Sequence, residues 1–165
     1  MDLNLYVIRG QENAGKTNAC WQILNKLKEN IECVNYWELR TKDEVRLDED
    51  RQCYVQKIGE KEITCDFVII VTLKVTHTKV AIISAGDVDY TLRDDIFFML
   101  KREVKHIVCC SRTINRESST FRMLHYYFEK HIKYSEEIHF STDVMVKKEW
   151  EEKASNEIYQ QIKIL

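Results

Sequence analysis

The octapeptide at residues 10–17, GQENAGKT, most constrains how this 165-residue chain can fold. It follows a mostly apolar segment, residues 3–8, which is typical of a short strand. It runs into residues 16–29, whose apolar positions recur with a helical period. Two of the chain's four glycines, Gly10 and Gly15, stand in the octapeptide, and the chain has no proline. Because glycine accepts backbone angles and close contacts that a Cβ forbids, the sequence predicts a tight turn between a strand and a helix.

The rest of the chain alternates between strand and helix patterns. The hydrophobic periodicity predicts helices over 92–104 and 117–131 and a last helix that Ser141, Thr142 or Asp143 could cap. It predicts strands at 33–39, 52–58, 61–73, 79–87, 106–110 and 136–140. This alternation predicts one α/β domain, residues 1–165, with a mainly parallel central sheet between helices. The strands at 52–58, 61–73 and 79–87 are expected to add an antiparallel β meander, and the charged residues 40–51 a solvated loop.

Composition restricts the partners and the compartment. The chain carries 25 basic and 27 acidic residues, a net charge of −2, which predicts no general attraction to nucleic acid or to an anionic membrane. No apolar run approaches the roughly 20 residues that span a bilayer, and the N-terminus lacks the basic region of a secretory signal. The six cysteines include no C-x-x-C pair, which favours reduced, buried thiols. We therefore expect a cytoplasmic protein whose anion site is local.

The octapeptide matches G-x-x-x-x-G-K-[ST] at every fixed position. In such a turn the backbone N–H groups can converge on a phosphate at a helix N-terminus, whose dipole favours anions. Lys16 would reach the β- and γ-phosphates, and the Thr17 hydroxyl would face Mg²⁺. The residues expected to hold the phosphates are Gly10, Asn13, Ala14, Gly15, Lys16, Thr17 and Asn18.

With these residues the chain resembles the P-loop NTPase superfamily, in which this octapeptide is the Walker A motif. The resemblance is specific for residues 1–30 and architectural beyond them. It implies a Rossmann-like three-layer fold with a nucleoside triphosphate bound at the carboxyl ends of the strands. An N-K-x-D guanine-reading motif is absent from the sequence, so ATP with Mg²⁺ is expected before GTP.

A second acidic residue is expected to assist the metal. Asp87 is the first candidate, because it follows an apolar run and Gly86, which would let the chain turn close to the phosphates. Asp89 is an alternative for the same role. Asp66 is a weaker rival, because it opens a predicted strand instead of closing one. A solvated turn before a helix explains Asp87 and Asp89 equally well.

Arginines follow the predicted strand at 106–110. A guanidinium at the end of that strand could reach the γ-phosphate or the anion of a second substrate. Arg112 is the main candidate and Arg116 the second, whereas Arg122 is expected on the exposed face of a helix.

Two functions fit these residues. The first is a small kinase-like phosphotransferase, with Lys16, Asp87 and Arg112 as its catalytic residues and a small-molecule phosphoryl acceptor. The second is a regulatory module that hydrolyses the nucleotide slowly and signals to a protein partner. Its partner surface would be residues 40–51 and the β meander.

Overall fold

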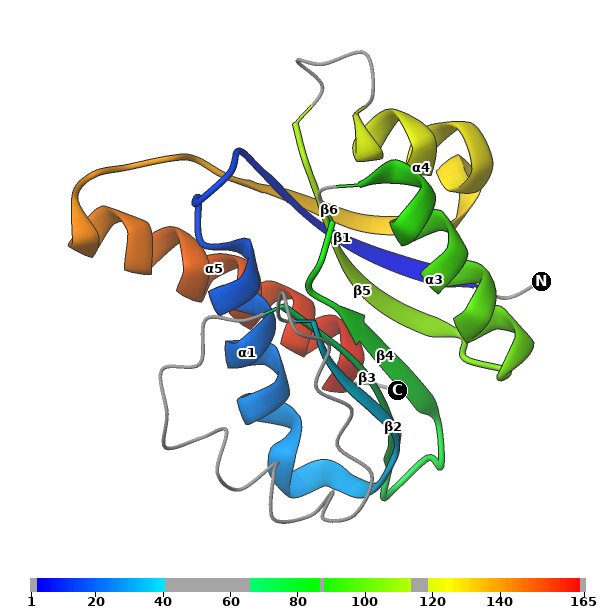
Figure 1. Cartoon of the computed structure of the whole chain (residues 1–165). Helices are drawn as coiled ribbons and strands as arrows, with labels where there is room; N and C mark the ends of the chain where they lie inside the picture. Colours follow the sequence, from blue (N-terminus) through cyan, green and yellow to red (C-terminus); the bar gives the residue numbers. More distant parts are fainter. Residues whose placement is uncertain (1–2, 41–65, 87, 114–118, 164–165) are drawn as a thin grey trace.

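The computed structural model describes residues 3–40, 66–86, 88–113 and 119–163. Within them, a six-stranded sheet is covered by helices on both faces (Figure 1). In chain order the elements are β1 (Asn4–Gly10), α1 (Lys16–Leu27), η1 (Lys28–Asn30), β2 (Ile31–Arg40), β3 (Asp66–Leu73), β4 (Lys79–Ile83), α3 (Asp89–Lys101), β5 (His106–Ser111), α4 (Thr120–Phe128), η2 (Glu129–His131), β6 (Ile132–Ile138) and α5 (Val144–Lys163). The α/β prediction is confirmed.

The sheet is mixed, with strand order β2-β3-β4-β5-β1-β6. Strands β4, β5, β1 and β6 run parallel to one another. Strand β3 is antiparallel to both β2 and β4. The antiparallel pairing of β3 with β4 was predicted, and it extends the sheet as expected. Of the predicted loop at 40–51, Arg40 instead ends β2. The rest of that loop and the predicted strand at 52–58 lie outside the described residues.

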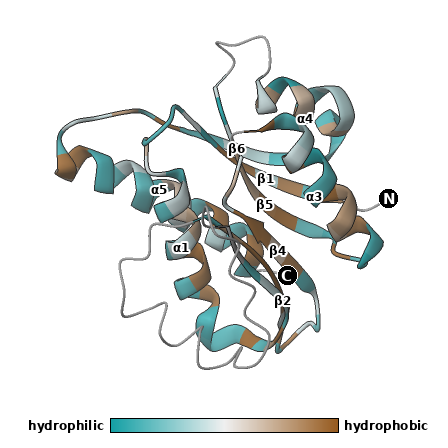
Figure 2. Ribbon diagram, viewed as in Figure 1, coloured by the Kyte–Doolittle hydropathy of each residue, from teal (hydrophilic) through white to brown (hydrophobic). Residues whose placement is uncertain are grey.

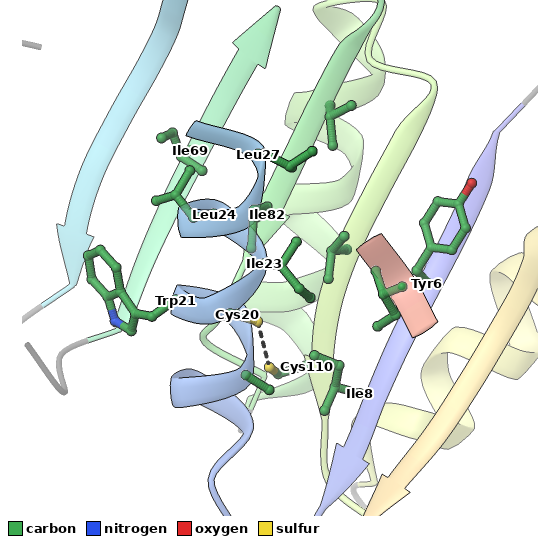
Figure 3. Close-up of a cluster of buried hydrophobic side chains, with 14 of the residues drawn as sticks. Tyr6, Ile8, Cys20, Trp21, Ile23, Leu24, Leu27, Ile69, Ile82 and Cys110 are labelled. Carbon is green, nitrogen blue, oxygen red and sulfur yellow. Dashed lines mark hydrogen bonds between the residues drawn. The ribbon is translucent and has the colours of Figure 1, made fainter. Parts of the chain in front are cut away.

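The two faces of the sheet support two hydrophobic layers. Helices α1 and α5 pack on one face and helices α3 and α4 on the other (Figure 1). The central strands are hydrophobic along most of their length, as Figure 2 shows, because a strand covered on both faces buries every side chain. In the α1 layer, Ile23, Leu24 and Leu27 lie over Ile69 and Ile82 of the sheet (Figure 3).

Three described cysteines confirm the prediction of buried free thiols, and Cys33 does not, because its side chain is exposed. Cys20 of α1 and Cys110 of β5 meet in the core, with their sulfur atoms 3.4 Å apart (Figure 3). This contact and burial raise the pKa of the Cys20 thiol. The Cys20 sulfur is therefore held as a neutral packing group.

The predicted boundaries of β6 are wrong. The sequence placed this strand at 136–140, but it spans Ile132–Ile138, where Leu5 pairs with Ile132 and Gly10 with Ile138. This strand is at the edge of the sheet, and its polar residues KYSEE stay partly exposed. Its length follows from pairing with β1, because its own hydrophobicity does not mark it.

The other boundaries differ by a few residues. Helix α3 begins and ends three residues before the predicted 92–104, and α4 begins at Thr120 and passes into η2 at Glu129. Strand β4 ends at Ile83, four residues before the predicted end. Within the described residues, no helix has the length and apolar character needed to cross a bilayer.

Candidate functional site

The turn between β1 and α1 depends on its two glycines. Gly15, the N-cap of α1, has φ +105°, a left-handed conformation that side chains disfavour. Asn13 is also left-handed, at φ +60°. A Cβ on Gly10 would lie 2.7 Å from the carbonyl oxygen of Ile138 on the adjacent strand. The backbone of the turn therefore passes too close to its neighbours for larger residues.

Lys16 is folded into this turn. Its side chain is only 8% exposed, and its Nζ donates to the carbonyl oxygens of Gly10 at 3.0 Å and Gln11 at 2.7 Å. The ammonium group thus lies against the backbone of the loop. Its helix starts without an acid in the first turn, and Gly15 has no side chain to cap the first N–H groups. The positive helix end and the ammonium group adjoin one another.

These groups border a hollow of about 310 Å³. It lies where the four parallel strands end, which is where open α/β sheets bind ligands. The lining residues are Glu12, Asn13, Ala14, Gly15, Lys16, Thr17, Asn18, Asp66, Ser84, Gly86 and Lys147. Every predicted phosphate-binding residue except Gly10 is among them. Gly10 instead ends β1 and accepts the hydrogen bond from Lys16.

Asp66 is the acid that the structure brings to the loop. Its Oδ1 accepts hydrogen bonds from Thr17 Oγ1 at 2.7 Å and from Ser84 Oγ at 3.2 Å. Asp66 was predicted to be a weaker candidate for assisting the metal, because it opens a strand. Since β3 runs antiparallel to β4, however, its first residue lies at the same sheet edge as the last residues of the parallel strands. An acid reaches this edge at the last residue of a parallel strand, but at the first residue of an antiparallel strand such as β3.

The other predicted acids are not described at the hollow. Asp87, the first candidate, lies outside the described residues. Asp89 begins α3 and lines a different hollow, between α3 and α4.

Neither Arg112 nor Arg122 lines the hollow. Arg112 follows β5, and its Nη2 is 3.5 Å from Oε2 of Glu12, a loop residue. Its backbone N–H donates to Thr120 Oγ1 at 2.7 Å. Arg116 lies outside the described residues. Arg122 is exposed on α4, as expected, and lines the hollow between α3 and α4.

The last helix contributes two side chains that the sequence did not single out. Lys147 lines the hollow from the first turns of α5. Glu151, one turn later, is only 4% exposed, and Asn18 Nδ2 donates to its Oε1 at 3.4 Å. Burial raises the pKa of Glu151, while Asn18, Lys147 and Lys148 favour its charged form. Nothing in the local spacing links α5 to residues 10–17, so only tertiary structure could find these two.

Comparisons with protein-family models, with curated proteins and with solved structures find no match.

The donor set of the hollow is suited to phosphate and a hard cation. An ammonium group, a hydroxyl and a carboxylate meet beside an uncapped helix N-terminus. No group of three or more His, Cys, Asp or Glu side chains is gathered in the described part of the chain. Magnesium sites typically use one or two carboxylates together with substrate phosphates and water. The residues present therefore fit Mg²⁺ held jointly with a phosphorylated ligand.

Proposed function

We propose that this chain binds a nucleoside triphosphate with Mg²⁺ through residues Gly10–Thr17, ATP being the predicted nucleotide. One observation carries the proposal: Lys16, the Thr17–Asp66 pair and the start of α1 border a single hollow at the carboxyl ends of the parallel strands. This arrangement supports the function that the G-x-x-x-x-G-K-[ST] motif predicts.

Each residue has a role in this proposal. Lys16 binds the β- and γ-phosphates, and the helix N-terminus favours their charge. Thr17 and Asp66 would hold the Mg²⁺, so Asp66 takes the role first predicted for Asp87. Mg²⁺ would neutralise charge on the phosphates. Arg112 stays a candidate for the γ-phosphate or a second substrate, although its guanidinium faces Glu12.

The proposed activity is transfer of the terminal phosphoryl group to a small-molecule acceptor. Catalysis would rest on positioning and on charge stabilisation by Lys16. A second candidate is a regulatory module with slow hydrolysis that signals to a protein partner. Four exposed apolar side chains favour it, because they lie in the sequence between β6 and Lys147: Phe140, Val144, Met145 and Val146.

Titration calorimetry with Mg²⁺ and a non-hydrolysable ATP analogue tests nucleotide binding. We expect Lys16→Ala to weaken binding at least about tenfold, the loss of a charge-assisted contact. Lys101→Ala, at an exposed position on α3, is the matched control and should stay within about twofold of the unmodified protein. Absence of binding to the unmodified protein, or equal binding by Lys16→Ala, would refute the proposal.

Label transfer then separates the two candidate activities. Transfer from γ-labelled ATP to a panel of small hydroxyl and phosphate acceptors supports the phosphotransferase. Slow phosphate release without an acceptor, altered by a protein partner, supports the regulatory module.

A further inference from the structure

Helix α5 lies along α1 in a fixed register. Glu151 of α5 accepts a hydrogen bond from Asn18 of α1. One turn further along both helices, Ser155 Oγ donates to Gln22 Oε1 at 2.8 Å. Later residues of α5 thus contact later residues of α1, which means that the two helices run in the same direction. The start of α5 therefore lies on the same side of the molecule as the phosphate loop.

Glu151 also packs against the loop glycine at the start of α1. A Cβ on Gly15 would lie 2.1 Å from Glu151 Oε1 and 2.8 Å from its Cδ and Cγ, so the carboxylate packs directly on the loop glycine. Lys147 is one helical turn before Glu151. The contact of Glu151 with Gly15 consequently brings Lys147 over the loop that precedes α1, where its side chain lines the hollow.

The charges that line the hollow indicate a role for Lys147 in binding anions. Its charged lining side chains are Glu12, Asp66, Lys16 and Lys147, two acids and two cations. Without Lys147 the acids would outnumber the single remaining cation, and that cation is already engaged with loop carbonyls. A triphosphate carries several negative charges, so a site with a net negative lining would repel it.

We infer that Lys147 is a second phosphate-binding cation, supplied to the nucleotide site by the C-terminal helix. The inference rests on the proposed function and extends it, because it makes α5 part of the nucleotide site. Helix α5 begins with the exposed residues Val144, Met145 and Val146, so the cation belongs to the element that also presents an apolar surface.

The chain offers a matched control. Lys148 is the next residue on the same helix, carries the same charge and is exposed, and it is not among the residues lining the hollow. The test is titration calorimetry with Mg²⁺ and a non-hydrolysable ATP analogue on Lys147→Ala, Lys147→Arg and Lys148→Ala. A thermal melt of each variant reports whether it is folded.

We expect Lys147→Ala to weaken the analogue's binding about tenfold, Lys147→Arg to restore most of it, and Lys148→Ala to stay within about twofold. Equal loss in Lys147→Ala and Lys148→Ala would overturn the inference, because it would indicate a general charge effect. Unchanged binding by Lys147→Ala, or failure of arginine to restore it, would also overturn it. If the alanine variant does not fold, Lys147→Gln replaces it under the same criteria.

The same experiment separates the two proposals. If the unmodified protein does not bind the analogue, the proposed function fails. If the protein binds and Lys16→Ala loses binding while Lys147→Ala does not, only the role of Lys147 fails.

Discussion

Replacing Gly15 with alanine should destabilise the protein by about 2–4 kcal/mol, as the sum of two separable effects. The first is backbone strain, because φ at Gly15 is +105° and a left-handed residue with a Cβ costs about 1–2 kcal/mol. The second is the collision with Glu151, whose Oε1, Cδ and Cγ all lie within 2.8 Å of the new Cβ. Moving that side chain breaks its contact with Asn18, worth about 1 kcal/mol, and disturbs its packing.

A double-mutant cycle separates the two effects. Urea denaturation would give the free energy of unfolding for the unmodified protein, Gly15→Ala, Glu151→Ala and the double variant. In the Glu151→Ala background the collision is gone and only the strain remains, so Gly15→Ala should cost about 1–2 kcal/mol less there.

Equal costs in both backgrounds would refute the contact between Gly15 and Glu151, and with it the register that brings Lys147 to the hollow. A cost near zero in either background would refute the left-handed conformation of Gly15. The same cycle is not possible at Gly86. A Cβ there would lie 1.9 Å from the backbone oxygen of Cys110, and truncating a side chain cannot relieve a collision with the backbone.

Two further predictions concern the carboxylates of the site. Glu151→Gln should stabilise the protein at neutral pH in thermal melts. Burial raises the pKa of Glu151 above its ordinary 4.5, so the folded state loses stability as pH rises from that value through the raised pKa. The stability gained by Glu151→Gln should therefore vanish near pH 4, where the carboxyl is protonated in both states. A gain in stability that persists at pH 4 would contradict this cause. Asp66→Asn keeps an acceptor for Thr17 and Ser84 but removes the charge, so the Mg²⁺ concentration that supports analogue binding should rise about tenfold or more in a calorimetric titration. Asp94→Asn, at an exposed position on α3, is its control, and an equal response of the two variants would argue against a metal-assisting role for Asp66.

The sequence predicts the turn between β1 and α1 well because the turn is local. The strand, the turn and the helix from residue 4 to residue 27 are set by neighbouring residues, and the two glycines mark where a Cβ cannot fit. The buried strands β3, β4 and β5 are equally visible, because burial on both faces requires continuous apolar runs. The edge strand β6 is the exception, since its residues are polar and only its partner defines it.

Sequence reasoning fails where the site depends on distant pairing. The antiparallel direction of β3 was predicted, but its consequence for Asp66, a contact with Thr17 of α1, depends on how the β3–β4 pair lies against α1. Lys147 and Glu151 lie within an amphipathic helix whose pattern shows which face is buried, but not which residue of α1 each position meets. In both cases the missing information is how an element far away in the chain lies against α1.

The antiparallel strand makes the position of the acid unusually well defined. β3 and β4 pair from Thr72 with Lys79 to Val68 with Ile83. Beyond that ladder, Phe67 N–H donates to Ser84 Oγ at 2.8 Å, and Ser84 N–H donates to the carbonyl oxygen of Phe67 at 3.0 Å. Ser84 Oγ in turn donates to Asp66, so the hydrogen bonds that end the β3–β4 pairing also orient the carboxylate toward Thr17. The loop, the β3–β4 pair and α5 therefore border one hollow, and a ligand bound to residues of all three would stabilise the folded state in which they meet.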